Sequence, residues 1–197
     1  MTDEARLRIG LGLLALALSL VLMPGCMQPT SALQLTSYKD PYFPETYSVA
    51  FTECAYSVDA GGDYHIVGRA TRIPADGSEA TVTQLLHIHL FWNPEPGKTF
   101  DHPSSVDATI RYAIVTERGT SVHCGTGFVF LERQRMSDRV VARVEAARLR
   151  PASQHGEPTE VLGDARVTGT LVAERDACLA IDLRRELDLH SGPDETP

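Results

Sequence analysis

Two histidines placed two residues apart are the strongest candidates for chemistry in this sequence. His87 and His89 occur in "LLHIHLFW" (85–92), an apolar stretch typical of a β-strand. Residues two apart on a strand share a face and lie about 6.6 to 6.8 Å apart along it, so both imidazoles could bind one divalent transition metal such as zinc. A neighbouring strand would have to supply the third ligand, for which His65 and His123 are the candidates.

The same stretch has a structural interpretation that needs no metal. Leu86, Ile88 and Leu90 occupy the opposite face of the strand, which is the natural core side. His87 and His89 would then form the outer half of an amphipathic strand, partly covered by a loop or a partner. We expect this structural interpretation, with no cofactor, and keep a His-x-His metal site as the alternative.

Other local signatures of catalysis are missing from the sequence. The segment "WNPEPGKT" (92–99) ends like a phosphate-binding loop, but Trp92 stands where the first glycine would be, and two prolines remove backbone N–H donors. A nucleotide is therefore not expected. The sequence has no Gly-x-Ser-x-Gly elbow, His-Glu-x-x-His helix or paired Cys-x-x-Cys site. These observations favour a protein that is not an enzyme.

The N-terminus predicts export from the cytoplasm. Arg6 and Arg8 precede an apolar run over residues 9–23. Fifteen residues at about 1.5 Å rise span roughly 22 Å, short of the roughly 30 Å hydrocarbon core, which favours a signal peptide over a membrane-spanning helix. Pro24 and Gly25 end the run directly before Cys26.

This arrangement resembles the lipobox of bacterial lipoproteins. The resemblance implies that residues 1–25 are a signal peptide and that Cys26 is lipidated and becomes the first mature residue. The chain departs from the usual pattern because Leu22 lies four residues before the cysteine rather than three, and Met23 and Pro24 occupy the positions where leucine and a small residue are commoner. Ordinary cleavage after Ala32 is the alternative, and it would discard Cys26.

Composition limits the partners of the exported chain. The net charge is −8 at pH 7, and removal of residues 1–25 leaves it unchanged because two acidic and two basic residues are lost. Such an acidic chain does not favour nucleic acid as a partner. Three further cysteines remain, and an oxidising compartment permits one disulfide between an unknown pair among them. These cysteines are Cys54, Cys124 and Cys178.

Strand patterns separated by turns predict an all-β fold. Residues 26–44 are rich in Thr, Ser, Pro and Gln and are expected to form a flexible tether, followed by a single domain over 45–197. About seven strands and a C-terminal helix with Leu179, Leu183 and Leu187 in one stripe predict a mostly antiparallel β-sandwich, favoured over a barrel. The expected strands are 47–58 with a bulge near Glu53, 64–73, 80–92, 108–116, 120–132, 138–150 (where a helix is the alternative) and 165–175.

The hairpin around Gly119 permits a prediction of register. A three-residue loop with Gly119 in the left-handed region would pair Thr116 with Thr120. The alternative two-residue loop would require Arg118 at positive φ, which is unfavourable. The first register points Ile110, Tyr112, Ile114, Val122, Cys124, Phe128 and Phe130 inward, and Arg111 and His123 outward.

Two segments resemble other proteins more broadly. "WNPEPGKT" and the later "GTGFVF" (125–130) are similar to stretches of uncharacterised secreted lipoproteins of environmental bacteria, a resemblance that implies no activity. Gly125 and Gly127 in the second segment are expected to mark a bulge or make room for a neighbour.

The sequence predicts a lipid-anchored binding or structural module of the cell envelope, periplasmic or at the cell surface. Its expected partners are the membrane and another envelope protein.

Overall fold

The structure is a computed structural model that describes residues 30–72, 81–91, 106–134, 137–158 and 162–191. The expected signal peptide, Cys26 and the "WNPEPGKT" segment lie outside the described residues.

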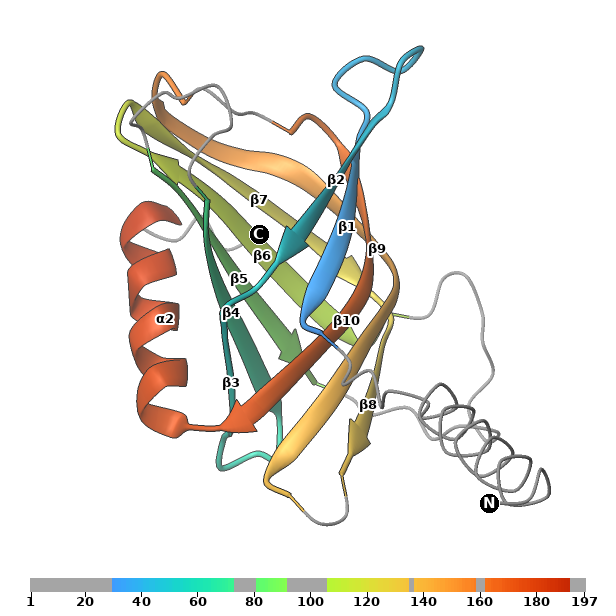
Figure 1. Cartoon of the computed structure of the whole chain (residues 1–197), viewed down its shortest axis with the longest axis vertical. Coiled ribbons are helices and arrows are strands. Elements are labelled where there is room, and N and C mark those ends of the chain that lie inside the picture. Colours follow the sequence, from blue (N-terminus) through green and yellow to red (C-terminus); the bar gives the residue numbers. More distant parts are fainter. Residues whose placement is uncertain (1–29, 73–80, 92–105, 135–136, 159–161, 192–197) are drawn as a thin grey trace, which may run out of the picture.

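Ten strands and one helix make up the described chain (Figure 1). The helix, α2, covers Ala177–Ser191. The strands are β1 (Ala32–Ser37), β2 (Glu45–Ala50), β3 (Glu53–Val58), β4 (Tyr64–Arg72), β5 (Val82–Leu90), β6 (Ala108–Thr116), β7 (Gly119–Gly127), β8 (Val129–Arg133), β9 (Arg139–Gly156) and β10 (Ala165–Arg175).

All ten strands belong to one hydrogen-bonded sheet in the order β2-β1-β10-β3-β4-β5-β6-β7-β9-β8, and β9 also pairs with β10. That additional pairing closes the sheet on itself. Every pairing is antiparallel except the short one between β10 and β3, where Glu174 lies opposite Ala55 and Arg175 opposite Tyr56. Figure 1 shows β1, β2, β9 and β10 as one wall facing a second wall of β3–β7.

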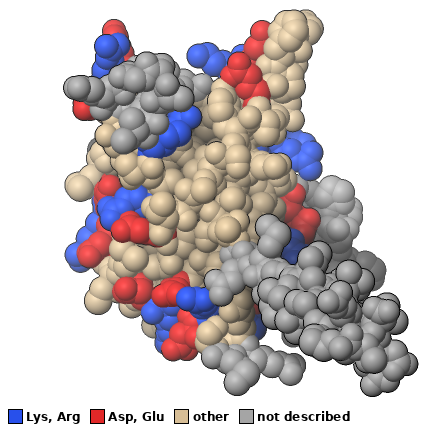
Figure 2. All heavy atoms as spheres, viewed as in Figure 1, with Lys and Arg blue, Asp and Glu red and all other residues tan. Residues whose placement is uncertain are grey.

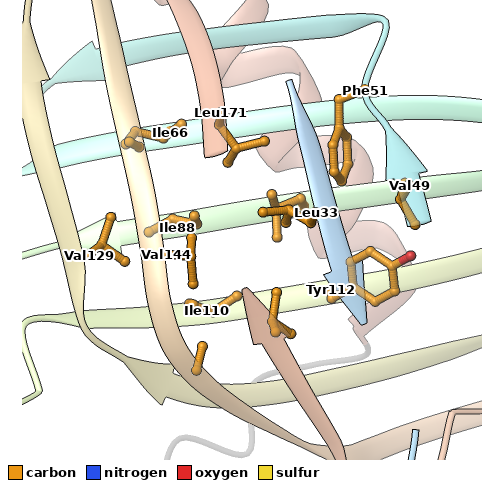
Figure 3. Packing of buried hydrophobic residues seen from close by; sticks show 14 of the residues in the cluster. Leu33, Val49, Phe51, Ile66, Ile88, Ile110, Tyr112, Val129, Val144 and Leu171 are labelled. Carbon is orange, nitrogen blue, oxygen red and sulfur yellow. The ribbon is translucent and has the colours of Figure 1, made fainter. Parts of the chain in front are cut away.

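The predicted fold class is confirmed: the chain is all-β and mostly antiparallel, with a C-terminal helix. The two facing layers that a sandwich implies belong to one continuous sheet. Side chains from both walls fill the space between them, among them Leu33 of β1, Leu171 of β10, Ile88 of β5 and Ile110 of β6 (Figure 3). Burial of these apolar side chains is the main contribution that holds the walls together.

The expected tether is corrected at its C-terminal end. Residues 32–37 form β1, because Leu33 and Leu35 alternate with polar residues and are each 1 % exposed in the interior. The expected bulge near Glu53 is a strand break. β2 pairs with β1, whereas β3 pairs with β4, so the two halves of the expected strand lie in different parts of the sheet. The strand expected over 138–150 is confirmed as part of the longer β9.

The predicted register of the β6–β7 hairpin is wrong by one residue. Thr116 pairs with Gly119 and Tyr112 with His123, so Glu117 and Arg118 alone form the turn. Gly119 serves close packing, because a Cβ there would lie 2.3 Å from the carbonyl oxygen of His155 on β9. Since a shift of one residue exchanges the two faces of a strand, His123 points inward. Val122 and Cys124 face the helix side instead, and Phe128 and Phe130 follow them on the outer face.

The helix α2 covers the outer face of the β3–β7 wall. Ala180, Leu183 and Leu187 pack against a small apolar cluster that includes Val67 and Leu85. Asp176 caps the helix, accepting a hydrogen bond from the backbone N–H of Leu179 at 3.0 Å. The stripe of leucines and the cap therefore position α2 beside the outward residues of β4 and β5.

Gly125 lies where β7 and β9 approach most closely. A Cβ at this position would be 1.7 Å from the carbonyl oxygen of Arg148 on β9. The glycine therefore makes room for the neighbouring strand, as the sequence indicated.

We expect Gly125→Ala to destabilise the fold by about 3 kcal/mol or more, because the backbone of β9 cannot move without disturbing the closed sheet. The free energy of unfolding from urea denaturation measures the effect. Gly61→Ala is the matched control, since its Cβ would meet only Asp59 Oδ1 at 3.3 Å in an exposed turn. Equal stability of the two variants would contradict the close approach of β7 and β9.

Candidate functional site

A pocket of about 880 Å³ lies inside the upper part of the sheet. It opens between β2, which is the end strand of the sheet, and the ends of β4, β5 and β6. β10 explains the opening: its residues 165–170 pair with β1, and only Glu174 and Arg175 pair with β3. β2 and the C-terminal end of β4 are therefore not paired with each other. We call the gap between them the seam, and the pocket lies in it.

The pocket grades from a charged rim to an apolar interior. Lys39, Asp40, Glu45 and Arg72 are exposed at the rim, where both signs of charge are present. The walls are mostly apolar and aromatic. They include Leu35, Val49, Ala70, Ile114, Leu162, Phe43, Tyr47 and Tyr112. Concave, mostly apolar sites with a few polar groups are typical of small-molecule binding.

A buried hydrogen bond lies at the floor of the pocket. The hydroxyl of Tyr112 donates to Gln84 Oε1 at 2.8 Å, and these residues are 1 % and 7 % exposed. That bond uses the amide oxygen of Gln84, and both residues line the pocket. Burial of a glutamine at an inward strand position is costly unless its amide is hydrogen-bonded, and the Tyr112 hydroxyl meets part of that need.

The hairpin between β1 and β2 forms one side of the pocket mouth. Figure 2 shows it as a projection at the top of the molecule whose outermost atoms belong to uncharged residues. Tyr42 and Phe43 are 87 % and 75 % exposed, and Phe43 also lines the pocket. Large exposed aromatic side chains beside a cavity are a feature of binding surfaces.

Three of the four predicted metal candidates come together outside the sheet, next to α2. His65 on β4 lies beside His87 and His89 on β5, and the rings of His65 and His89 stack with centroids 4.6 Å apart. His65 Nδ1 is 3.1 Å from His87 Nε2, a hydrogen bond between two imidazoles. The turn before β4 supplies acidic partners: Asp63 Oδ2 lies 3.0 Å from His89 Nε2, and Asp59 Oδ2 lies 3.5 Å from His65 Nε2.

His123 does not join this cluster. It points into the interior opposite Tyr112 and is fully buried, and neither ring nitrogen has a hydrogen-bond partner among the described residues. The described residues contain no group of three or more His, Cys, Asp or Glu side chains arranged to hold a metal ion. Through its contacts with Asp59 and Asp63, the histidine cluster links the β3–β4 turn to β5.

Burial determines the protonation of the cluster. It lowers the pKa of His87 to about 2, and the nearby guanidinium groups of Arg111 and Arg184 act in the same direction. Burial also lowers the pKa of His65, against the opposing effect of Asp59. His87 and His65 are therefore neutral hydrogen-bonding groups at neutral pH.

The three cysteines in the described residues are free thiols. Cys54 packs against the interior, Cys124 packs against the cluster under α2, and Cys178 is exposed. Cys54 and Cys124 thus lie on opposite faces of the sheet. The disulfide that the sequence permitted is not formed.

The geometry defines an all-β protein with an internal pocket, and comparisons add no relative. No protein-family model, curated protein or solved structure that was compared with the chain matches it. Among the described residues, no helix has the length and apolar character needed to cross a membrane.

Sequence reasoning missed the pocket, although one residue of β5 signals it. Gln84 interrupts the inward series Val82, Leu86, Ile88 and Leu90 on β5. A polar residue at a core position of a strand indicates a buried hydrogen bond or a polar cavity. The separation of β2 from β4 has no comparable signal in the sequence, since it depends on which residues of β10 pair with β1 and which pair with β3.

The buried histidines predict loss of stability in mild acid. The unfolded state takes up a proton at His87 near pH 6.5, whereas the folded state does so only near its pKa of about 2. The unfolded state binds more protons between these values, so the contribution of His87 to stability falls as the pH falls below 6.5. Between pH 7 and pH 5 this loss is about 2 kcal/mol for one group.

We therefore expect His87→Gln to lose about 2 kcal/mol less than the wild type between pH 7 and pH 5. Urea denaturation at each pH measures the difference. Burial raises the pKa of Asp107 to about 6, which has the opposite effect on stability, but this contribution cancels because both chains carry it. His155→Gln, which changes an exposed side chain on β9, is the control. An unchanged pH dependence in His87→Gln would show that His87 is not held neutral.

Proposed function

We propose that the protein is a lipid-anchored binding protein of the cell envelope that holds a small amphipathic molecule in its pocket. The observation that carries the proposal is the pocket of about 880 Å³, with apolar walls and the buried Gln84–Tyr112 pair at its floor. No covalent chemistry is required of the protein in this role. Binding energy comes from burial of the apolar part of the ligand.

The lining indicates the chemistry of the ligand. An apolar chain or ring system would lie against Val49, Ala70 and Ile114, and a hydrogen-bond acceptor on it would meet the amide of Gln84. A polar or charged end would stay at the rim, where Lys39 and Glu45 offer both signs of charge. These features support a fatty-acid-like or similarly amphipathic molecule.

The anchoring part of the proposal rests on the sequence. The apolar run over residues 9–23 followed by Cys26 is similar to a lipoprotein signal, and lipidation of Cys26 would hold the domain at a membrane in the periplasm or at the cell surface. A metal site at His65, His87 and His89 is the second candidate. We favour this metal site less than ligand binding in the pocket. The hydrogen bond between His65 and His87 already uses one ring nitrogen of each residue, which leaves fewer nitrogens to bind a metal.

Filling the pocket should abolish binding. Ala70 is 6 % exposed, lines the pocket and pairs with Gln84, so Ala70→Phe would place a ring where the ligand lies. We expect a tenfold or greater loss of affinity for a fluorescent fatty acid, measured by titration of its emission. Ala152→Phe adds the same ring at an exposed position of β9 and is the matched control. Equal affinity of both variants would exclude the pocket as the binding site.

Removal of the anchor should release the protein. Cys26→Ala is expected to move the chain from the membrane fraction of the cells to the soluble extracytoplasmic fraction, because the acyl chains that hold it are lost. Fractionation followed by immunoblotting measures the distribution. Cys178→Ala, at an exposed cysteine of α2, is the control. If the Cys26→Ala chain stays with membranes that have been washed with salt, lipidation of Cys26 is not the anchor.

A further inference from the structure

Four arginines are gathered on the outer face of β9 and β10. Arg143, Arg148 and Arg150 belong to β9 and Arg166 to β10, and all four are exposed. We call this set the arginine face. None of the four forms an ion pair or a side-chain hydrogen bond with a described residue, whereas Arg69, Arg111 and Arg139 are each paired with a carboxylate. The gathering is notable because the whole chain carries a net charge of −8.

Two of these arginines lie directly opposite each other. Arg148 and Arg166 are cross-strand partners, and Cβ atoms of such partners are about 5 Å apart. Like charges in this position destabilise a sheet, and folding alone gives no reason to place them there. Glu145 is the acidic residue that lies between Arg143 and Arg148 on β9, and β10 has no acidic residue from Ala165 to Ala173. An external anion would relieve the repulsion.

The chain leaves the domain beside the Arg143 end of the arginine face. Ser31 Oγ donates to the carbonyl of Val172 on β10 and accepts from its N–H, at 3.0 and 2.9 Å. The next residue, Ala32, pairs with Thr170, and Thr170 pairs with Arg143. Two strand spacings, roughly 10 Å, thus separate Ala32 from Arg143. The five peptide steps from Cys26 to Ser31 can span at most about 18 Å.

We infer that the arginine face docks on the anionic headgroups of the membrane to which the chain is attached. Two observations favour a membrane as the binding partner of the arginine face: its positive charge is complementary to anionic headgroups, and only a short segment connects the domain to Cys26. A basic patch against anionic headgroups is a common additional contribution to the membrane binding of a lipid-anchored protein. The inference goes beyond the proposed ligand binding, and its use of the anchor rests on the proposed lipidation of Cys26.

The test uses the full chain with Cys26→Ala, so that no acyl chain dominates the binding. Sedimentation with phosphatidylcholine vesicles, and with the same vesicles containing phosphatidylglycerol, gives two partition coefficients. Their ratio isolates the charge-dependent contribution, because every contribution that does not depend on headgroup charge is common to both measurements. Each arginine near an anionic surface contributes about fivefold, so Arg148→Gln with Arg166→Gln should lower the ratio about 25-fold.

The matched control is Arg118→Gln with Arg185→Gln, which removes the same charge at exposed positions in the β6–β7 turn and on α2. It should keep most of the preference for anionic vesicles, and high salt should abolish that preference. Melting temperature checks the fold, and loss of the Arg148–Arg166 repulsion should leave it unchanged or raise it. An equal ratio for the two double variants, or no preference in the parent chain, would overturn the inference.

The two proposals fail in different ways. If Cys26 is not lipidated, Cys26→Ala stays on cell membranes while the vesicle ratio still depends on Arg148 and Arg166. If the arginine face does not bind headgroups, Cys26→Ala is released from cells but the ratio is unaffected by the two arginine substitutions.

Discussion

The pairing of β9 with β10 is the constraint on which the rest of the structure depends. β9 uses one edge for β10 and the other for β7 and β8, so a single strand joins the two walls of the sheet. Register shifts occur where β9 meets its neighbours, between Val167 and Gly169 of β10 and between Val122 and His123 of β7. Such irregularities bend a strand and increase its twist, which lets β9 turn from one wall to the other. Without this pairing the inner faces of both walls would be exposed to water.

The pocket follows from the same closure. β10 has only one edge left after pairing with β9, and that edge is divided between β1 and the last residues next to β3. No strand bridges β2 and β4 in the described residues, so the interior stays accessible at this seam. Two inward side chains at this opening carry polar groups: Gln84 and Tyr112 are hydrogen-bonded to each other, whereas Leu86 and Ile88 continue the apolar core along β5. The pocket thus results from the way β10 pairs with its neighbours, and the polar group at its floor results from a single residue of β5, Gln84.

Local patterns predicted most strands, the helix and its cap, because alternation and leucine spacing report burial directly. They also placed His87 and His89 on one face, since parity along β5 is independent of the fold around it, but they could not choose between His65 and His123 as the third residue. The hairpin register failed because Gly119 is required by the approach of β9, a contact that sequence spacing does not reveal. β1 was hidden because Leu33 and Leu35 are its only large apolar residues among polar ones. Closure of the sheet depends on pairing between distant segments, which no local signal encodes.

The orientation of the pocket can be argued from β1 alone. Its first residue, Ala32, follows the connection to Cys26, and its last residue, Ser37, lines the pocket. Five steps along a strand separate them by roughly 17 Å. Arg166 is the cross-strand partner of Thr36, next to Ser37, so the arginine face runs along β1 toward the pocket mouth. With the arginine face against the headgroups, both ends of β1 would lie near the membrane, and the pocket mouth would open beside its surface. An amphipathic molecule of that membrane could then reach the pocket without crossing the aqueous compartment.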